Sequence, residues 1–126
     1  MHERTREHAM LTRIQADEFA AEWIAAWNSH DLERILSHYS ADFTMASPRI
    51  ATIANEPSGV LHGKAAVAAY WAKALALLPD LHFELIATFV GADSVAIHYE
   101  GVRGPAVEVF FFDADGLVCR AAAHYV

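Results

Sequence analysis

The fold is decided by the last third of the chain, residues 81–126, which reads LHFELIATFVGADSVAIHYEGVRGPAVEVFFFDADGLVCRAAAHYV. Apolar side chains recur there at every second position, as they do on strands with a buried face. Turn residues interrupt the pattern at 91–93 and 114–116. We therefore predict a four-strand antiparallel meander, whose core face carries Leu81, Phe83, Leu85, Ala87 and Phe89 and then Val95, Ile97 and Tyr99.

The last hairpin has two apolar faces. With a two-residue loop at Ala114-Asp115, Glu108 would lie opposite Ala121, and Phe110 opposite Cys119. The inner face would then hold Glu108, Phe110, Phe112, Cys119, Ala121, Ala123 and Tyr125, and the outer face Val107, Val109, Phe111, Val118, Arg120, Ala122 and His124. Because the helices can cover only one face, we expect the outer face to form a homodimer interface.

Helices precede this meander. The spacing of Phe19, Trp23 and Trp27 predicts an amphipathic helix, and Asp31 is a candidate cap for the next one. The expected order is a helix over 14–29, a second carrying Leu32, Ile35, Leu36 and Tyr39, a short strand over 43–46, an irregular segment over 49–59, and a third helix over 64–78. The irregular segment reads either as a lid or as a plain long loop. Helices followed by a meander indicate the α+β class.

Composition limits the possible partners. The 126 residues are 55% hydrophobic with a net charge of −7, which argues against a nucleic-acid or anionic-membrane partner. We expect a flexible tail over 1–12 and a single domain over 13–126. Cys119 is the only cysteine and no signal peptide or membrane span is visible, so we expect a cytoplasmic protein.

Several short stretches resemble a known superfamily. Residues 23–32 (WIAAWNSHDL), 39–43 (YSADF), 47–48 (SP) and 62–67 (HGKAAV) resemble the nuclear-transport-factor-2-like superfamily. Residues 108–116 (EVFFFDADG) and the final His124-Tyr125 are similar to its polyketide-cyclase-like (SnoaL-like) branch. The resemblance implies a cystatin-like cone, in which three N-terminal helices pack on a curved, mostly antiparallel sheet around an apolar pocket.

The resemblance also implies where pocket residues stand. By local motif, Trp23, Ser47 and Glu108 occupy the positions of the tyrosine, the general base and the second oxyanion-hole acid of ketosteroid isomerase. With a serine in place of the base, that reaction by the known mechanism is not expected. The expected ligand-binding residues are Trp23, Trp27, Tyr39, Ser47, Trp71, Ile97, Tyr99, Phe110, Ala121, Ala123 and Tyr125, with Val95 beside them.

Glu108 is the candidate catalytic residue. A carboxyl on an apolar, pocket-facing strand would have a raised pKa and could act as general acid or base, or it could only anchor the cone by a hydrogen bond. Two functions stay open: a cyclase-, isomerase- or hydrolase-like enzyme acting on a hydrophobic oxygenated small molecule, or a non-catalytic homodimeric ligand-binding or interaction module. No cofactor is predicted. A metal site at the His82-Glu84 and His98-Glu100 pairs is less favoured than a solvated outer face. His62 and Arg49 are read as surface residues that could reach a ligand at the pocket mouth.

Overall fold

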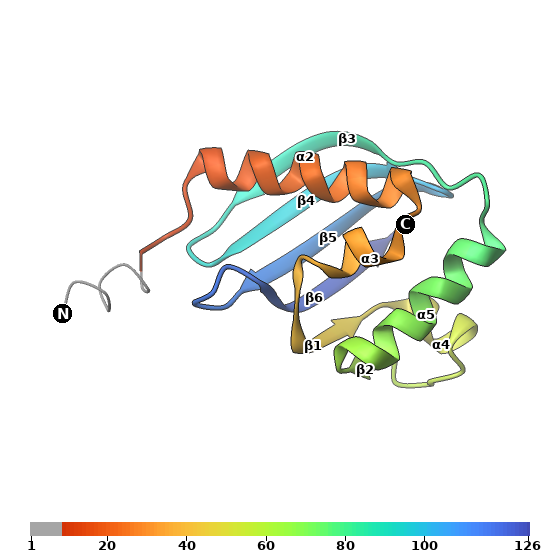
Figure 1. Ribbon diagram of the computed structural model, residues 1–126. Helices are drawn as coiled ribbons and strands as arrows, with labels where there is room; N and C mark the ends of the chain where they lie inside the picture. The colour runs from red at the N-terminus through yellow and green to blue at the C-terminus, as the bar shows by residue number, and fades with distance from the viewer. Residues whose placement is uncertain (1–8) are drawn as a thin grey trace.

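Six strands form one curved sheet in the computed structural model, which describes residues 9–126 (Figure 1). They are β1 (Tyr39–Ala46), β2 (Val60–His62), β3 (Glu84–Val90), β4 (Ser94–Gly101), β5 (Gly104–Phe112) and β6 (Val118–Tyr125). Their order is β2-β1-β6-β5-β4-β3, and only the β1–β6 pair is parallel. The predicted α+β fold, with helices on a mostly antiparallel sheet, is confirmed.

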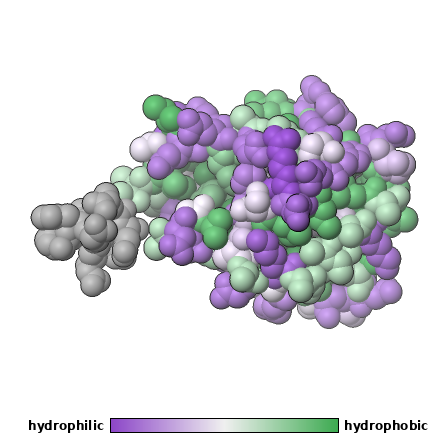
Figure 2. All heavy atoms as spheres, viewed as in Figure 1, coloured by the Kyte–Doolittle hydropathy of each residue, from purple (hydrophilic) through white to green (hydrophobic). Residues whose placement is uncertain are grey.

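The helices lie on one side of this sheet. They are α2 (Arg13–Ser29), α3 (Leu32–Leu36), α4 (Pro48–Ile53) and α5 (Lys64–Leu77). Helix α2 runs along β3, and α5 packs on β1 at the other end of the sheet (Figure 1). In the space-filling view, a pale apolar area covers the region of α5, in keeping with its alanine- and leucine-rich sequence (Figure 2). The core therefore lies between the curved sheet and these helices. The first eight residues of the expected 1–12 tail lie outside the described part of the chain.

Local capping sets the ends of the first two helices. Thr12 and Gln15 form a capping box at the start of α2, and His30 ends that helix in the left-handed conformation with φ 61°. The Asp31 side chain then accepts a hydrogen bond from the Arg34 backbone N–H at 3.2 Å, as predicted for a cap of α3.

Two predicted boundaries are wrong around β1. Tyr39 was expected on the second helix, but α3 ends at Leu36 and Tyr39 opens β1, where it pairs with Val118. Packing explains this, because the Tyr39 ring lies 4.5 Å from that of Phe43 and 5.0 Å from that of Trp71. The segment 49–59 was expected to be irregular, but it contains most of α4. The Ser47 hydroxyl accepts from the Arg49 N–H, and Pro48 occupies the first helical position.

The predicted core face of the first meander strand is also wrong in part. Leu81 and Phe83 are buried, but they precede β3. A bulge between Leu85 and Ala87 then shifts the alternation. As a result Thr88 lies opposite Ile97, and Phe89 lies opposite Ala96 on the outer face with 57% of its surface exposed.

The last hairpin has a different register from the predicted one. Glu108 pairs with Ala123 and Phe110 with Ala121, because the Asp113 carboxylate accepts from the N–H groups of Asp115 and Leu117 and makes the loop longer than two residues. This shift of two residues preserves the predicted faces except at the bulge beyond Phe111. There Val118 is fully buried, and half-buried Cys119 instead places its Sγ 3.4 Å from the Phe111 carbonyl.

Candidate functional site

A largely apolar cavity opens between the helices and the inner face of β4 and β5. Its volume is about 60 Å³, which is room for a few waters or a narrow group. Its walls are Trp23, Trp27, Met45, Arg49, Ile53, Tyr70, Trp71, Ala74, Leu78, Leu81, Phe83, Tyr99, Gly101, Val102, Gly104, Glu108 and Tyr125. Among these residues one side chain is acidic and one is basic.

Glu108 is that acidic group. It stands on β5 between Ile97 of β4 and Ala123 of β6, and only 4% of its surface is exposed. The Tyr99 hydroxyl donates to its Oε1 over 3.3 Å, a long and therefore weak hydrogen bond. Burial raises the pKa of Glu108 to about 7, while the Tyr99 hydrogen bond and the charge of Arg49 oppose that rise. Both protonation states of this carboxyl are therefore accessible near neutral pH.

Three tyrosines surround the carboxyl and remain protonated. Burial and the negative charge of Glu108 raise the pKa of Tyr125 to about 12 and that of Tyr99 well above its usual range. Burial likewise raises the pKa of Tyr70, whereas the Ser47 hydroxyl opposes the rise at both Tyr70 and Tyr125. The cavity thus holds phenolic O–H groups that can donate to a ligand oxygen.

The aromatic wall is built from α2 and the segment before β3. Phe83 stacks on Trp23, with ring centroids 5.7 Å apart and an interplanar angle of 19°, and its centroid lies 4.7 Å from that of Tyr99. Trp27 stands edge-on to Trp71, with centroids 5.2 Å apart. The indole N–H of Trp27 is buried without a hydrogen-bond partner within residues 9–126.

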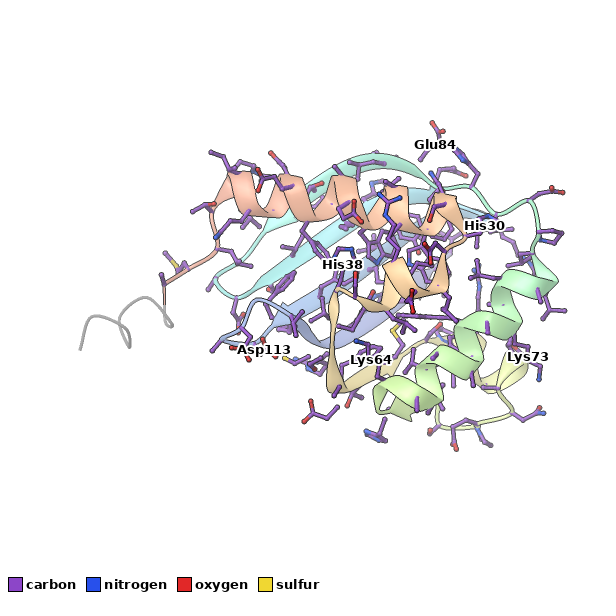
Figure 3. All side chains as sticks on the ribbon, in the orientation of Figure 1. His30, His38, Lys64, Lys73, Glu84 and Asp113 are labelled. Atoms are coloured by element: carbon purple, nitrogen blue, oxygen red, sulfur yellow. The ribbon has the colours of Figure 1, made fainter. Side chains whose placement is uncertain are left out.

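Polar side chains at the end of α2 hold this wall in place. The Asn28 side chain donates to the Phe83 carbonyl at 2.9 Å and accepts from the Phe83 N–H at 2.7 Å. The His30 Nε2 lies 2.8 Å from the Leu81 carbonyl, and His30 projects from the end of α2 in Figure 3. Sequence reasoning treated residues 28–31 as a break and missed this role. Asn28 and His30 bond to backbone groups more than 50 residues away, and such a contact leaves no pattern in the neighbouring sequence.

Half of the predicted site residues line the cavity, namely Trp23, Trp27, Trp71, Tyr99, Glu108 and Tyr125. The other six predicted residues are buried but lie outside the lining of this cavity: Tyr39, Ser47, Ile97, Phe110, Ala121 and Ala123. The Phe19 and Trp23 rings pack on Phe110 at 4.9 and 5.3 Å and fill that part of the cone. Tyr39 instead accepts from the Trp23 Nε1 at 3.1 Å.

Several lining residues were missed by sequence reasoning. Tyr70 and Ala74 are spaced one helical turn apart on α5, as the buried face of a helix requires, so this spacing could have found them. Phe83 and Leu81 were assigned to the core without a place at the cavity. Arg49, read from sequence as a surface residue, contributes to the wall.

The two histidine–glutamate pairs lie apart from the cavity. His82 Nε2 is 2.9 Å from Glu84 Oε2, with both side chains mostly exposed, and Glu84 points outward in Figure 3. His98 and Glu100 lie opposite Val107 and Pro105 on the outer face. Within residues 9–126 there is no group of three or more His, Cys, Asp or Glu side chains placed to hold a metal ion.

This geometry defines a class of protein: an α+β cone whose curved sheet and helices enclose a small apolar pocket. A family model described as the SnoaL-like domain matches residues 20–123, so the chain belongs to the SnoaL-like family. None of the curated proteins matches the sequence. In the part of the chain that the structure describes, no helix is long and apolar enough to cross a membrane.

Solved structures of similar fold agree with this assignment. A SnoaL-like protein of unknown function from Burkholderia thailandensis is 57% identical, with 93% of this chain and 98% of that chain covered and a TM-score of 0.90. IdmH from Streptomyces antibioticus, named as a candidate polyketide cyclase, is 20% identical, with coverages of 86% and 90% and a TM-score of 0.70. SalBIII, an epoxide hydrolase/cyclase-like enzyme of pyran-ring formation in salinomycin, is 18% identical, with coverages of 90% and 92% and a TM-score of 0.69. The last two likenesses concern the fold alone.

Proposed function

We propose that this protein is a small enzyme that binds a hydrophobic, oxygenated molecule in the cone and uses Glu108 as general acid and base. The observation that carries the proposal is a single carboxyl, buried in an apolar cavity, whose pKa is raised to about 7. A group with that pKa exchanges protons most effectively near neutral pH. The names of IdmH and SalBIII give cyclisation as a precedent on this fold.

The lining residues suggest how such chemistry would run. In its ionised form, Glu108 would take a proton from a carbon next to a substrate carbonyl, and the electron pair of that C–H bond would pass to the carbonyl oxygen. In its protonated form it would return the proton. The neutral Tyr125 or Tyr70 hydroxyl would donate to the developing oxyanion, and the aromatic wall would exclude water and so strengthen these interactions.

Substitution Glu108→Gln tests the role of this residue. Glutamine keeps the shape of the side chain but cannot exchange the proton, so turnover of a substrate found by screening apolar carbonyl compounds should fall by about 100-fold or more. Ligand affinity should change little. The matched control is Glu100→Gln, the same change on the outer face. Unchanged turnover in Glu108→Gln would exclude the acid–base role.

A second function is a non-catalytic binding module. It is favoured by the fact that the cavity holds only one group that titrates near neutral pH, whereas the tyrosines around it stay protonated. Such a module would retain its ligand without turnover and would be insensitive to Glu108→Gln. It would lose affinity in Trp71→Ala, which removes an aromatic wall of the cavity.

We also propose that the protein is a homodimer. The outer face carries an apolar row across four strands, Phe89, Ala96, Val109 and Ala122, which are paired in register from β3 to β6. Phe89 and Val107 of this face are 57% and 36% exposed. A second copy would remove this surface from water. Because Cys119 is the only cysteine, a reducing compartment such as the cytoplasm suits the chain.

A further inference from the structure

The mouth of the cavity is basic, although the chain as a whole carries a net charge of −7. Arg49 of α4 lines the cavity itself and also two shallow depressions that adjoin it. Arg103, in the exposed turn between β4 and β5, lines both depressions. None of the described side chains that line them is acidic. Two of the nine lysines and arginines of the chain therefore line the region where a ligand would enter.

Arg49 is held in place, and within the described residues its side-chain donors are unused. Its guanidinium carbon lies 3.7 Å from the centre of the Tyr125 ring, so the group lies over the aromatic face in a cation–π contact. Its backbone is fixed by the hydrogen bond from its N–H to Ser47. Within residues 9–126 no carboxylate lies within 4.0 Å of its side-chain nitrogens, and they donate no hydrogen bond. A stacked guanidinium with free N–H groups is pre-organised for a planar, two-oxygen acceptor.

The rest of the wall is suited to the other end of such a ligand. Beyond Arg49 the lining is aromatic and aliphatic, with Trp71 and Phe83 as the largest flat surfaces. The negative charge that Glu108 can carry is buried deeper, on β5. An anion would therefore be attracted to the mouth and disfavoured inside. The cavity thus has a polarity along its length.

We propose that the ligand is an apolar carboxylate, whose carboxylate binds Arg49, with Arg103 in support, and whose apolar body lies in the aromatic cavity. This inference rests on the proposed function, because it assigns a substrate class to the same pocket. Arg49 is a specificity-determining residue in this scheme. It fixes which end of the molecule faces solvent and so presents the opposite, oxygenated end to Glu108.

A pair of probes of equal shape tests the inference. Isothermal titration calorimetry on the whole chain would compare hexanoate with neutral hexanamide, whose narrow chains suit the cavity. We expect the carboxylate to bind about tenfold tighter or better, and the difference to shrink as salt is added. Arg49→Gln should remove this preference, mainly by weakening binding of the carboxylate, and the affinity for the amide should change much less. Arg49→Lys should keep part of the preference for the carboxylate, because lysine has the positive charge but lacks the planar guanidinium that donates two parallel hydrogen bonds.

The chain offers a matched control. Arg120 also stacks on an aromatic ring, with its guanidinium carbon 3.9 Å from the centre of Phe111, but it lies on the outer face. Arg120→Gln should keep the preference for the carboxylate. A preference that survives Arg49→Gln would overturn the inference, and so would a preference that is lost in Arg120→Gln.

The remaining outcomes separate this inference from the proposed function. Equal binding of both probes by the wild type, weakened in Trp71→Ala, would overturn the carboxylate assignment and leave the pocket function standing. Binding of neither probe would overturn the inference and count against a ligand-binding cone altogether.

Discussion

Substitution Asn28→Ala should destabilise the fold and loosen the cavity at the same time. The Asn28 amide makes two hydrogen bonds to the backbone of Phe83, at 2.9 and 2.7 Å, in a partly buried position. Each is worth about 1 kcal/mol, and the Phe83 N–H and carbonyl would lose partners that solvent replaces only in part. We therefore expect a loss of about 2–3 kcal/mol in the free energy of unfolding.

Urea denaturation followed by tryptophan fluorescence measures this loss. All three tryptophans are buried near the wall that Asn28 supports, so the signal reports on the right region. If the free energy of unfolding falls by about 1.5 kcal/mol per molar urea, the urea concentration at the unfolding midpoint should fall by about 1–2 M. The control is Gln15→Ala, which removes one exposed hydrogen bond of the α2 capping box and should cost about 0.5–1 kcal/mol.

The same variant tests the link from the α2 terminus to the pocket. Phe83 stacks on Trp23 and lines the cavity, so a released Phe83 backbone should also weaken binding of a narrow apolar probe such as hexanamide. A midpoint for Asn28→Ala within the error of the wild type, with unchanged probe binding, would refute the role given to this side chain.

Three further predictions concern the pocket and the outer face. The pKa of Glu108 is about 7 in the folded protein against 4.5 in the unfolded chain. Its protonated side chain therefore contributes to the free energy of unfolding fully below pH 4.5, and this contribution is lost as the pH rises through 7. The wild type should therefore lose about 3 kcal/mol relative to Glu108→Gln between about pH 4 and pH 8, and a constant difference in unfolding free energy would contradict this. Tyr99→Phe removes the hydroxyl that donates to the Glu108 carboxylate, so it should raise the pKa of Glu108 further, as read by the midpoint of the same stability profile. On the outer face, Val109→Glu places a charge in the middle of the apolar row and should convert a dimer to a monomer in native mass spectrometry, whereas Asp115→Lys in the exposed turn should not; a dimer that survives Val109→Glu would exclude this interface.

Alternation and helical spacing made the class of the fold predictable. The buried face of β4, with Val95, Ile97 and Tyr99, follows from period two alone, and the cap at Asp31 follows from its side chain. The bulge after Leu85 could not be foreseen, because an extra residue in one strand depends on the twist of the whole sheet. It turned Phe89 to the outer face and so added to the apolar surface there.

The site was predictable where the alternation along a strand alone turns a side chain toward the cavity. Glu108, Tyr99 and Tyr125 meet this condition. Phe110 has the correct parity but is covered by Phe19 and Trp23 of α2, and only the position of that helix decides which inward residues are covered. Arg49 lay in a segment read as irregular, and its stacking on Tyr125 joins residues 76 positions apart.

The central claim is that Glu108 exchanges its proton near neutral pH, and its carboxyl can be observed directly. With glutamate labelled at the side-chain carboxyl carbon, a carbon NMR titration follows each carboxyl, and the signal absent in Glu108→Gln identifies this one. We predict a midpoint near pH 7, well above the ordinary value of 4.5. A midpoint between 4 and 5 would contradict it, since a carboxyl that is already ionised and solvated at neutral pH could not act as a general acid in the cone.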